Sequence, residues 1–207
     1  MIFPGRIFIT GTDTGIGKSL VSAMLLAGLE GKYWKPVQSG LEDITDTEWV
    51  KEKTGLDDTH FFPETYRLKQ PLSPHASARA DGVRIELNKF KIPQTGDGEI
   101  LIIEGAGGIM VPLNEKELMI DLIKKCSAPA LVVARSGLGT INHTLLSINQ
   151  LRNEGIDISG VVMNGPRNSS NRDAIERFGS VKVIAEVEKI TDINPESLKE
   201  FFRKYFG

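Results

Sequence analysis

Residues 7–19 read IFITGTDTGIGKS, and this stretch decides the fold. The apolar, partly β-branched run from Ile7 to Ile9 predicts a buried strand. A turn rich in glycine and threonine follows it, and an apolar helical pattern begins after Ser19. This layout is typical of a phosphate-binding loop, in which backbone N–H groups and the helix N-terminus face an anion. Lys18 would reach the β- and γ-phosphates, and Ser19 could hold Mg²⁺.

The glycine spacing of this loop departs from the usual one. Counting back from Gly17, the first glycine of the pattern falls on Thr12, whereas the chain has a glycine one residue earlier, at Gly11. A search by spacing alone would miss the loop. The prediction therefore needs support from other parts of the chain.

Length and composition favour a single soluble domain. The 207 residues suit one domain, 1–207, with a substantial core. A net charge of -2 with scattered Lys and Arg gives no footprint for nucleic acid. The single cysteine, Cys126, lies in an apolar stretch and is expected to face the core. No apolar run approaches the roughly 20 residues of a membrane span, so we expect no membrane partner and a cytoplasmic protein.

Strand and helix patterns alternate along the whole chain. Strands are expected at 7–9, 33–37, 99–103, 128–134, 156–163 and 181–185, and helices at 20–26, 45–50, 87–90, 118–125, 141–152, 172–178 and 195–205. Thr45 and Glu48 are spaced as a capping box, and Thr140 is the expected N-cap of its helix. Prolines predict an irregular segment at 59–81. This alternation predicts an α/β fold, a mostly parallel sheet flanked by helices on both faces, of the phosphate-loop NTPase type.

Chemically useful side chains follow several of these strands, where ligands of such sheets gather. Glu104 is an isolated acid between an aliphatic run and Gly-Ala-Gly-Gly, which favours a Mg²⁺ ligand over a turn acid. Lys35 could be an ordinary strand-end lysine, but beside a phosphate loop it becomes a candidate second cation. Ser39 and Asn164 also follow strands. Asp46, taken alone, is better explained as a first-turn helix acid than as a metal ligand.

Other features have a structural explanation that we prefer. His75 has no Cys or His partner at metal spacing, and His143 lies inside an amphipathic helix, so both are predicted to be structural. The aromatic and basic segment 198–206 could lie on a membrane surface, but docking of its aromatic side chains on the core is the commoner arrangement.

These features together resemble one family, the dethiobiotin synthetases, which are ATP-dependent ring-closing enzymes of biotin synthesis. The matching segments, in family order, are Thr10–Thr14 with Gly17–Ser19, Lys35–Gly40, Pro71–His75, Glu104–Gly108, Gly139–His143 and Val162–Asn164. The displaced loop glycine is itself a trait of that family. The resemblance covers most of the chain up to about residue 165.

The resemblance implies a homodimeric enzyme that joins 7,8-diaminononanoate, CO₂ and ATP, with Mg²⁺, into dethiobiotin, ADP and phosphate. One amine becomes a carbamate, the carbamate oxygen attacks the γ-phosphate to form a carbamic–phosphoric anhydride, and the second amine closes the ring. Such phosphoryl transfer depends on positioning and charge neutralisation more than on a base.

The same resemblance implies roles for individual residues. Lys18, Lys35 and Thr14 would serve catalysis, and Ser19, Asp46 and Glu104 would hold the metal. Ser39 would lie near the carbamate, and Gly139, Thr140, Ile141 and Asn142 would bind the substrate carboxylate at a helix start. Contacts to ATP would come from Asp13, Thr14, Gly15, Ile16, Gly17, Lys18, Ser19, Asp46, Glu104, Gly105, Ala106, Gly107 and Asn164, the last at the adenine edge.

Rival interpretations stay open at this point. A nucleotide-driven switch or scaffold ATPase of the deviant phosphate-loop group would carry a lysine near the loop start, where this chain has Thr12 and Asp13. An amide-forming ligase of the same superfamily would need a glutaminase module. The chain also has Ala185–Glu188 where the family has Gly-x-Ile-Pro beside the adenine, which leaves base selectivity open.

Overall fold

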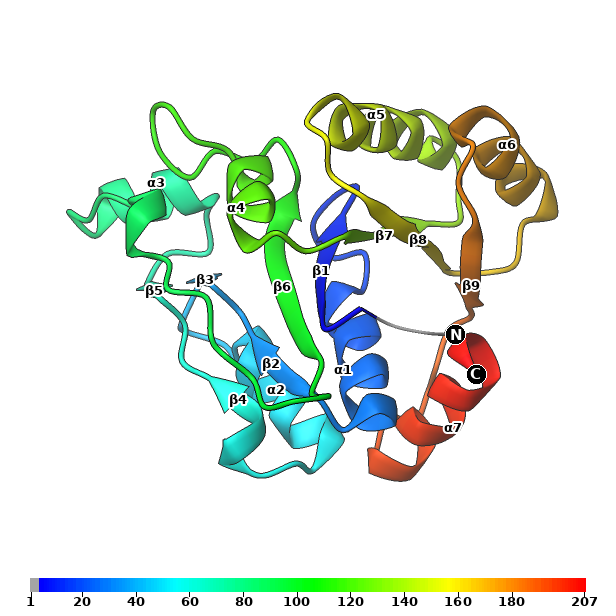
Figure 1. Ribbon diagram of the computed structural model, residues 1–207, viewed down its shortest axis with the longest axis horizontal. Coiled ribbons are helices and arrows are strands. Elements are labelled where there is room, and N and C mark those ends of the chain that lie inside the picture. Colours follow the sequence, from blue (N-terminus) through cyan, green and yellow to red (C-terminus); the bar gives the residue numbers. More distant parts are fainter. Residues whose placement is uncertain (1–3) are drawn as a thin grey trace.

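The structure is a computed structural model that describes residues 4–207. Seven parallel strands form its central sheet (Figure 1). In spatial order they are β4 (Phe61–Phe62), β2 (Lys32–Trp34), β6 (Leu101–Gly108), β1 (Arg6–Gly11), β7 (Ala130–Arg135), β8 (Ile158–Asn164) and β9 (Val183–Val187). Two further parallel strands, β3 (Val37–Ser39) and β5 (Tyr66–Leu68), pair with each other. This architecture confirms the predicted parallel α/β fold.

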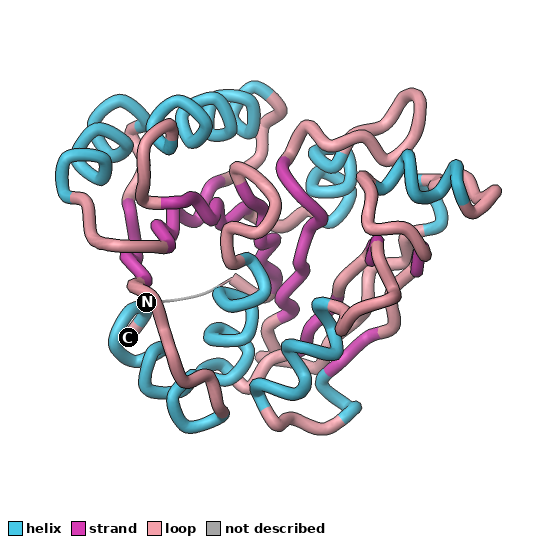
Figure 2. Tube along the Cα trace, turned by 180° about the vertical axis from the view of Figure 1, so that it is seen from behind, coloured by secondary structure: helices cyan, strands magenta, loops and turns pink. Residues whose placement is uncertain are grey.

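Helices cover both faces of the sheet. The apolar cluster on one face joins it to α1 (Lys18–Leu29), α2 (Asp46–Thr54) and α7 (Pro195–Phe206). The cluster on the other face includes α4 (Met119–Cys126), α5 (Thr140–Asn153) and α6 (Ser169–Gly179), with α3 (Pro74–Ala80) beside β3 and β5. Figures 1 and 2 show the two helical layers on opposite sides of the strands. Along β1, Ile7 and Ile9 pack on the first face and Phe8 on the second, as strand alternation requires.

The expected strand at 33–37 is wrong as one element. The chain forms β2, then Lys35 and Pro36, and then β3 in a different sheet. Pro36 has no N–H to continue a ladder, and its carbonyl instead accepts from the N–H groups of Thr65 and Tyr66. The break leaves the Lys35 side chain at the end of β2.

The segment 59–81 is also more regular than expected. It contains a 3₁₀ turn at Asp58–His60, then β4, β5 and α3. Pro74 does not break α3, because it occupies the first turn, where its missing N–H costs no helical bond. The helix expected at 87–90 is one 3₁₀ turn, Leu87–Lys89.

Two boundaries near the strand ends differ from expectation in ways that matter for the site. Strand β6 does not end before Glu104 but continues through the small residues to Gly108, paired with β1. Thr140 is not an N-cap: Gly139 caps α5 in a left-handed conformation, and the Thr140 hydroxyl lies 3.4 Å from that of Thr144. Thr45 and Glu48 do form the predicted capping box at α2.

The aromatic side chains of α7 dock on the core, as expected. Phe206 is buried, and the ring of Phe202 lies so close to Gly28 of α1 that a Cβ there would be 2.0 Å from it. No helix within residues 4–207 combines the length and apolarity that crossing a bilayer needs. Cys126 is buried, and burial raises the pKa of its thiol to about 12, which confirms a core role.

Candidate active site

The phosphate loop joins β1 to α1 and is shaped by its glycines. Gly17 caps α1 with φ 96° and no side-chain capping bond, so the first N–H groups of the helix stay available. A Cβ on Gly11 would lie 2.6 Å from Ile16 Cδ1 and 2.9 Å from the Asp13 carbonyl oxygen. The loop therefore folds back over Gly11. This close approach explains why the glycine stands one residue earlier than the usual pattern places it.

Lys18 lies inside this loop rather than in solvent. Its side chain is buried, and Nζ donates to the Asp13 carbonyl oxygen at 3.0 Å. Burial lowers the pKa of Lys18, and the nearby Lys35 ammonium lowers it further. The loop thus holds a desolvated cation beside the helix N-terminus, which suits binding of phosphate oxygens.

Three oxygen ligands from three elements meet beside Lys18. Ser19 Oγ on α1 lies 2.9 Å from Asp46 Oδ1 at the start of α2 and 2.9 Å from Glu104 Oε1 on β6. The hydroxyl has one proton and can donate to only one carboxylate at a time. This excess of acceptors fits a hard cation such as Mg²⁺.

These ligands fit a metal that is shared with a substrate phosphate. Mg²⁺ is usually bound through one or two carboxylates plus phosphates rather than by an all-protein cage. Residues 4–207 contain no group of three or more His, Cys, Asp or Glu that could hold a metal by themselves. The resemblance-based assignment of Ser19, Asp46 and Glu104 is thus spatially consistent and stays a prediction.

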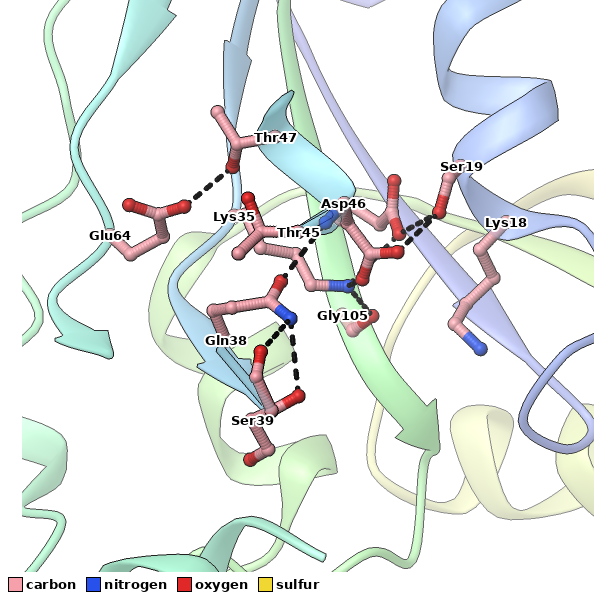
Figure 3. Close-up of polar contacts among 12 residues, drawn as sticks. Lys18, Ser19, Lys35, Gln38, Ser39, Thr45, Asp46, Thr47, Glu64 and Gly105 are labelled. Atoms are coloured by element: carbon pink, nitrogen blue, oxygen red, sulfur yellow. Dashed lines mark hydrogen bonds and ion pairs between the residues drawn. The ribbon is translucent and has the colours of Figure 1, made fainter. Parts of the chain in front are cut away.

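Lys35 is buried and lies at the centre of the charged groups of the site (Figure 3). Of its two carboxylate partners, Glu104 is fully buried and Asp46 is partly exposed. Its ammonium lies 2.6 Å from Asp46 Oδ2 and 2.9 Å from Glu104 Oε1, and it donates to the Gly105 carbonyl oxygen at 3.1 Å. Burial by itself lowers the pKa of Lys35, but the two carboxylates outweigh it and the net shift is upward. For Asp46 burial raises the pKa, and Lys35 reverses the shift to a net decrease. Both groups therefore stay charged near neutral pH.

Sequence reasoning missed the partner of the second Glu104 oxygen. Glu104 is fully buried, and Oε2 accepts from the Tyr33 hydroxyl at 3.0 Å. Burial, followed by the charges of Glu104 and Asp46, raises the pKa of Tyr33 well above its ordinary value. The available signal was strand alternation, because Tyr33 stands two residues before Lys35 and points to the same side.

A cleft of about 1190 Å³ opens over these residues. It is lined by the phosphate loop including Asp13, Thr14, Gly15 and Gly17, by Lys18, Ser19, Lys35, Ser39, Asp46 and Glu104, and by 71–74 and 106–112. The hydroxyls of Thr12 and Ser39 are buried beside it with no hydrogen-bond partner among the described residues. The cleft thus brings most predicted site residues together and offers free hydroxyls to a ligand.

Some predicted site residues do not line this cleft. Residues 139–142 lie at the start of α5 outside the lining, and the adjacent Leu138 is fully exposed. Ile16, Gly105 and Asn164 are also outside it. The Asn164 amide instead donates to the Ile16 carbonyl oxygen at 2.8 Å, which places Asn164 against the back of the phosphate loop.

The two histidines of interest differ. His143 is exposed and lines the cleft together with Leu146 and Ser147, and the expectation that it is structural stays a prediction. Its position on α5, one turn after Gly139, turns it to the cleft rather than to the core. His75 is outside the lining, and its ring nitrogen Nδ1 lies 3.1 Å from the Ser73 hydroxyl.

An ion pair joins the phosphate loop to the end of β7. Arg135 contacts the Asp13 carboxylate, and both side chains are partly exposed. The pKa of Asp13 is lowered chiefly by the N–H of Thr14, which donates to its carboxylate, and additionally by Arg135. The pair thus connects two loops that are far apart in sequence.

Comparison with known proteins agrees with this geometry. A family profile described as an AAA domain matches residues 5–197. The chain is 47% identical to the ATP-dependent dethiobiotin synthetase BioD of Paramagnetospirillum magneticum, over 93% of this chain and 92% of that protein. It is 44% identical to the protein of the same name from Agrobacterium fabrum, over 98% and 94% of the two chains.

Similarity to solved structures concerns the fold alone. The MinD cell division protein of Aquifex aeolicus aligns with a TM-score of 0.55 at 14% identity, over 97% of this chain and 96% of that one. Chloroplast FtsY from Physcomitrella patens aligns with a TM-score of 0.52 at 16% identity, over 100% and 66%. The sequence identities over nearly full length, by contrast, establish membership: the chain belongs to the ATP-dependent dethiobiotin synthetase family.

Proposed function

We propose that this chain, acting as a single catalytic domain, converts 7,8-diaminononanoate, CO₂ and ATP into dethiobiotin, ADP and phosphate. The observation that carries the proposal is the convergence of two buried lysines and three oxygen ligands on one cleft, which continues past the phosphate loop to 106–112. Family membership supports the same reaction.

The reaction proceeds in three balanced steps. One substrate amine attacks CO₂, forming a C–N bond and releasing a proton, to give a carbamate. A carbamate oxygen then attacks the γ-phosphorus as the bond to the β-phosphate oxygen breaks, which releases ADP. The second amine attacks the carbamoyl carbon, the C–O bond to phosphate breaks, and the urea ring closes with loss of a proton.

The lysines have separate roles in this scheme. Lys18, at the end of the phosphate loop, binds the β- and γ-phosphates. Lys35 offsets the negative charge of the carbamate as it approaches the γ-phosphate, an electrostatic contribution that is large in a water-poor site. All three Lys35 N–H donors are directed at protein oxygens, so contact with the carbamate requires exchange of one of them. Thr14 and Ser39 at the cleft wall supply further hydrogen bonds to the reacting oxygens.

Mg²⁺ is the cofactor that the oxygen ligands support. Ser19, Asp46 and Glu104 would hold it, and when bound it would neutralise charge on the phosphate oxygens. The reaction needs no Ser-His-Asp set, because a carbamate is already a competent nucleophile. The protein's part is to hold the phosphates and to orient the carbamate.

The position of the N-terminal end of α5 supports a homodimer. Residues 139–142 are proposed to bind the substrate carboxylate through N–H groups at a helix N-terminus. They do not line the cleft of their own protomer, and Leu138 beside them is fully exposed. We therefore assign them to the cleft of a second subunit. The adenine contact of Asn164 and a cytoplasmic location complete the proposal.

The direct test is a mass-spectrometric assay with 7,8-diaminononanoate, bicarbonate, Mg²⁺ and ATP. We expect dethiobiotin and ADP in equal amounts. Absence of dethiobiotin from folded protein that binds ATP would overturn the proposal. ATP hydrolysis without the diamine would instead favour a switch or scaffold ATPase.

The dimer proposal has its own test. Lys18→Ala subunits are mixed with Asn142→Ala subunits. If the site is shared, each mixed dimer has one intact site, with Lys18 from one subunit and Asn142 from the other. At diamine concentrations well below KM, where the Asn142→Ala parent is slowed, we expect activity above that of either parent variant. Activity no higher than the parents would place residues 139–142 outside a shared site.

A further inference from the structure

We propose that Tyr33 is a positioning residue for Glu104: its buried hydroxyl holds the carboxylate so that Oε1 faces Ser19 and the metal ligands. Tyr33 does not line the cleft, so it would act only through Glu104 and not by touching a substrate. The inference rests on the proposed role of Glu104 as a metal ligand.

The first support is that the two Glu104 oxygens have different partners. Oε1 lies 2.9 Å from Ser19 Oγ and 2.9 Å from Lys35 Nζ, at the wall of the cleft. Oε2 accepts from the Tyr33 hydroxyl at 3.0 Å. Glu104 and Tyr33 are both fully buried, so water does not replace this bond. The hydroxyl therefore resists rotation of the carboxylate about its last side-chain bond.

The second support is that the strands bring the two side chains together in a fixed geometry. Tyr33 is paired with Ile102 across β2 and β6, and Glu104 follows Ile102 by two residues on the same face. The Tyr33 ring packs edge-on against Phe61, with centroids 5.9 Å apart. Both partners are thus on rigid strands, where supporting groups hold a site most accurately.

A hydrogen bond to the far oxygen of a metal-binding carboxylate has a known kind of consequence. Loss of such an outer partner typically lowers metal affinity 10- to 100-fold. Removing the Tyr33 hydroxyl leaves Oε2 buried without its donor, so Glu104 can turn away from Ser19. The expected effect is on metal binding first and on nucleotide binding hardly at all, because Lys18 and the loop N–H groups are untouched.

The test compares Tyr33→Phe with Tyr66→Phe. Tyr66 is a matched control, because its hydroxyl accepts one hydrogen bond, from the Glu86 N–H at 3.0 Å, and its ring packs edge-on against Phe90 at 5.3 Å. Mn²⁺ is titrated by electron paramagnetic resonance into full-length protein carrying a non-hydrolysable ATP analogue. We expect the Mn²⁺ dissociation constant to rise about tenfold for Tyr33→Phe and to stay at the wild-type value for Tyr66→Phe. Affinity for the analogue in EDTA should match wild type in both.

A double-mutant cycle with Glu104→Gln separates this inference from the proposed site. Coupling through Glu104 predicts that Tyr33→Phe adds no further loss of Mn²⁺ affinity in the Glu104→Gln background. If Tyr33→Phe alone does not fold, the double variant still provides the test, because its residue 104 is a neutral amide and not a buried carboxylate without its donor. An additional loss in the double variant would overturn the inference.

The remaining outcomes discriminate as well. Weakened Mn²⁺ binding by Glu104→Gln with none by Tyr33→Phe would overturn the role of Tyr33 and leave the proposed function intact. Unchanged Mn²⁺ binding by Glu104→Gln would overturn the metal role of Glu104 and the inference with it. Equal loss of metal and of analogue affinity in Tyr33→Phe would show a general structural defect, which also overturns the inference.

Discussion

Two glycine-rich loops of this protein begin helices in the same way and yet have different surroundings. One joins β1 to α1 and the other joins β7 to α5. Gly17 caps α1 at φ 96°, Gly139 caps α5 at φ 89°, and neither helix has a side-chain capping bond. In both loops a left-handed glycine thus leaves the helix start without a capping side chain, although the Thr140 N–H of α5 donates to the Gly137 carbonyl oxygen at 3.2 Å.

The side chains around the two loops make the difference. The first helix begins with Lys18 and Ser19 and meets two carboxylates and a second lysine at the cleft. The second helix begins with a buried threonine followed by Ile141 and Asn142. Residues 139–142 lie outside the cleft of their own protomer, whereas His143, Leu146 and Ser147 further along α5 line it.

A helix N-terminus without a capping side chain thus determines where an anion can bind but not which reaction the anion undergoes. Charge neutralisation for phosphoryl transfer comes from the cations and the metal ligands around the first loop. The second loop offers N–H groups and the exposed Asn142 side chain, which suits a carboxylate that is held and not transformed. Substitutions in both loops test this difference in role.

The largest effect is expected for Lys18→Ala. Loss of this cation should reduce turnover by about 10²–10³-fold, the cost of removing one preorganised charge-stabilising donor. Turnover is measured by dethiobiotin formation under saturating substrates. Exposed Lys182→Ala is the control and should match wild type. Near-normal turnover of Lys18→Ala would contradict the proposal that this cation gives the first loop its role in phosphoryl transfer.

Glu104→Gln should reduce turnover at least about tenfold, because a neutral amide binds a hard cation more weakly than a carboxylate. Substrate binding should change less. The measurement is the separation of kcat from KM at several Mg²⁺ concentrations. Unchanged turnover at every Mg²⁺ level would remove Glu104 from the site.

The cap glycines provide a matched pair of substitutions. A Cβ on Gly17 would lie 2.2 Å from Asn164 Nδ2, whereas a Cβ on Gly139 would meet nothing within 4 Å. Both variants carry the strain of alanine at positive φ, roughly 1–2 kcal/mol, but only Gly17→Ala also displaces Asn164. We therefore expect Gly17→Ala to lower the free energy of unfolding and nucleotide affinity more than Gly139→Ala. Chemical denaturation and ATP-analogue titration measure both, and equal losses would contradict the structural difference.

Asn142→Ala should act on one substrate only. Removal of a polar group beside the second loop should raise KM for 7,8-diaminononanoate by several fold, consistent with about 1 kcal/mol for one hydrogen bond. KM for ATP and kcat should stay unchanged. Steady-state kinetics with each substrate varied in turn provide the measurement. A rise in KM for ATP would assign the second loop to the nucleotide instead.

Arg135→Gln, which breaks the ion pair between the two loops, should have the smallest effect. Exposed pairs contribute about 0–1 kcal/mol, so the loss of stability at pH 7 should stay below about 1 kcal/mol. Since the folded-state pKa of Asp13 is lowered, its contribution is present above the unfolded value of about 3.9 and disappears as pH falls through the folded value. Tm of the variant and of wild type, measured from neutral pH into acid, should therefore converge at low pH. A difference that persists in acid would show that Arg135 acts through another group.

Local patterns were sufficient for much of this molecule. The phosphate loop, the order of strands and helices and the isolated acid of β6 follow from apolar periodicity and from the positions of glycines. The roles of Lys35 and Asp46 do not follow from such patterns, since a strand-end lysine and a first-turn acid both have ordinary explanations. The structure brings their side chains within 2.6 Å of each other, which those local patterns do not encode.

Tertiary structure decided the rest, because contacts between distant segments depend on strand register. The hydroxyl of Tyr33 reaches Glu104, 71 residues later, only because β2 and β6 are neighbours in the sheet with Tyr33 opposite Ile102. The sequence by itself determined that an anion-binding loop opens the chain and which family it resembles. The fold decided that two buried lysines and two carboxylates surround that loop, while the similar loop at Gly139 lies outside the cleft of its own protomer.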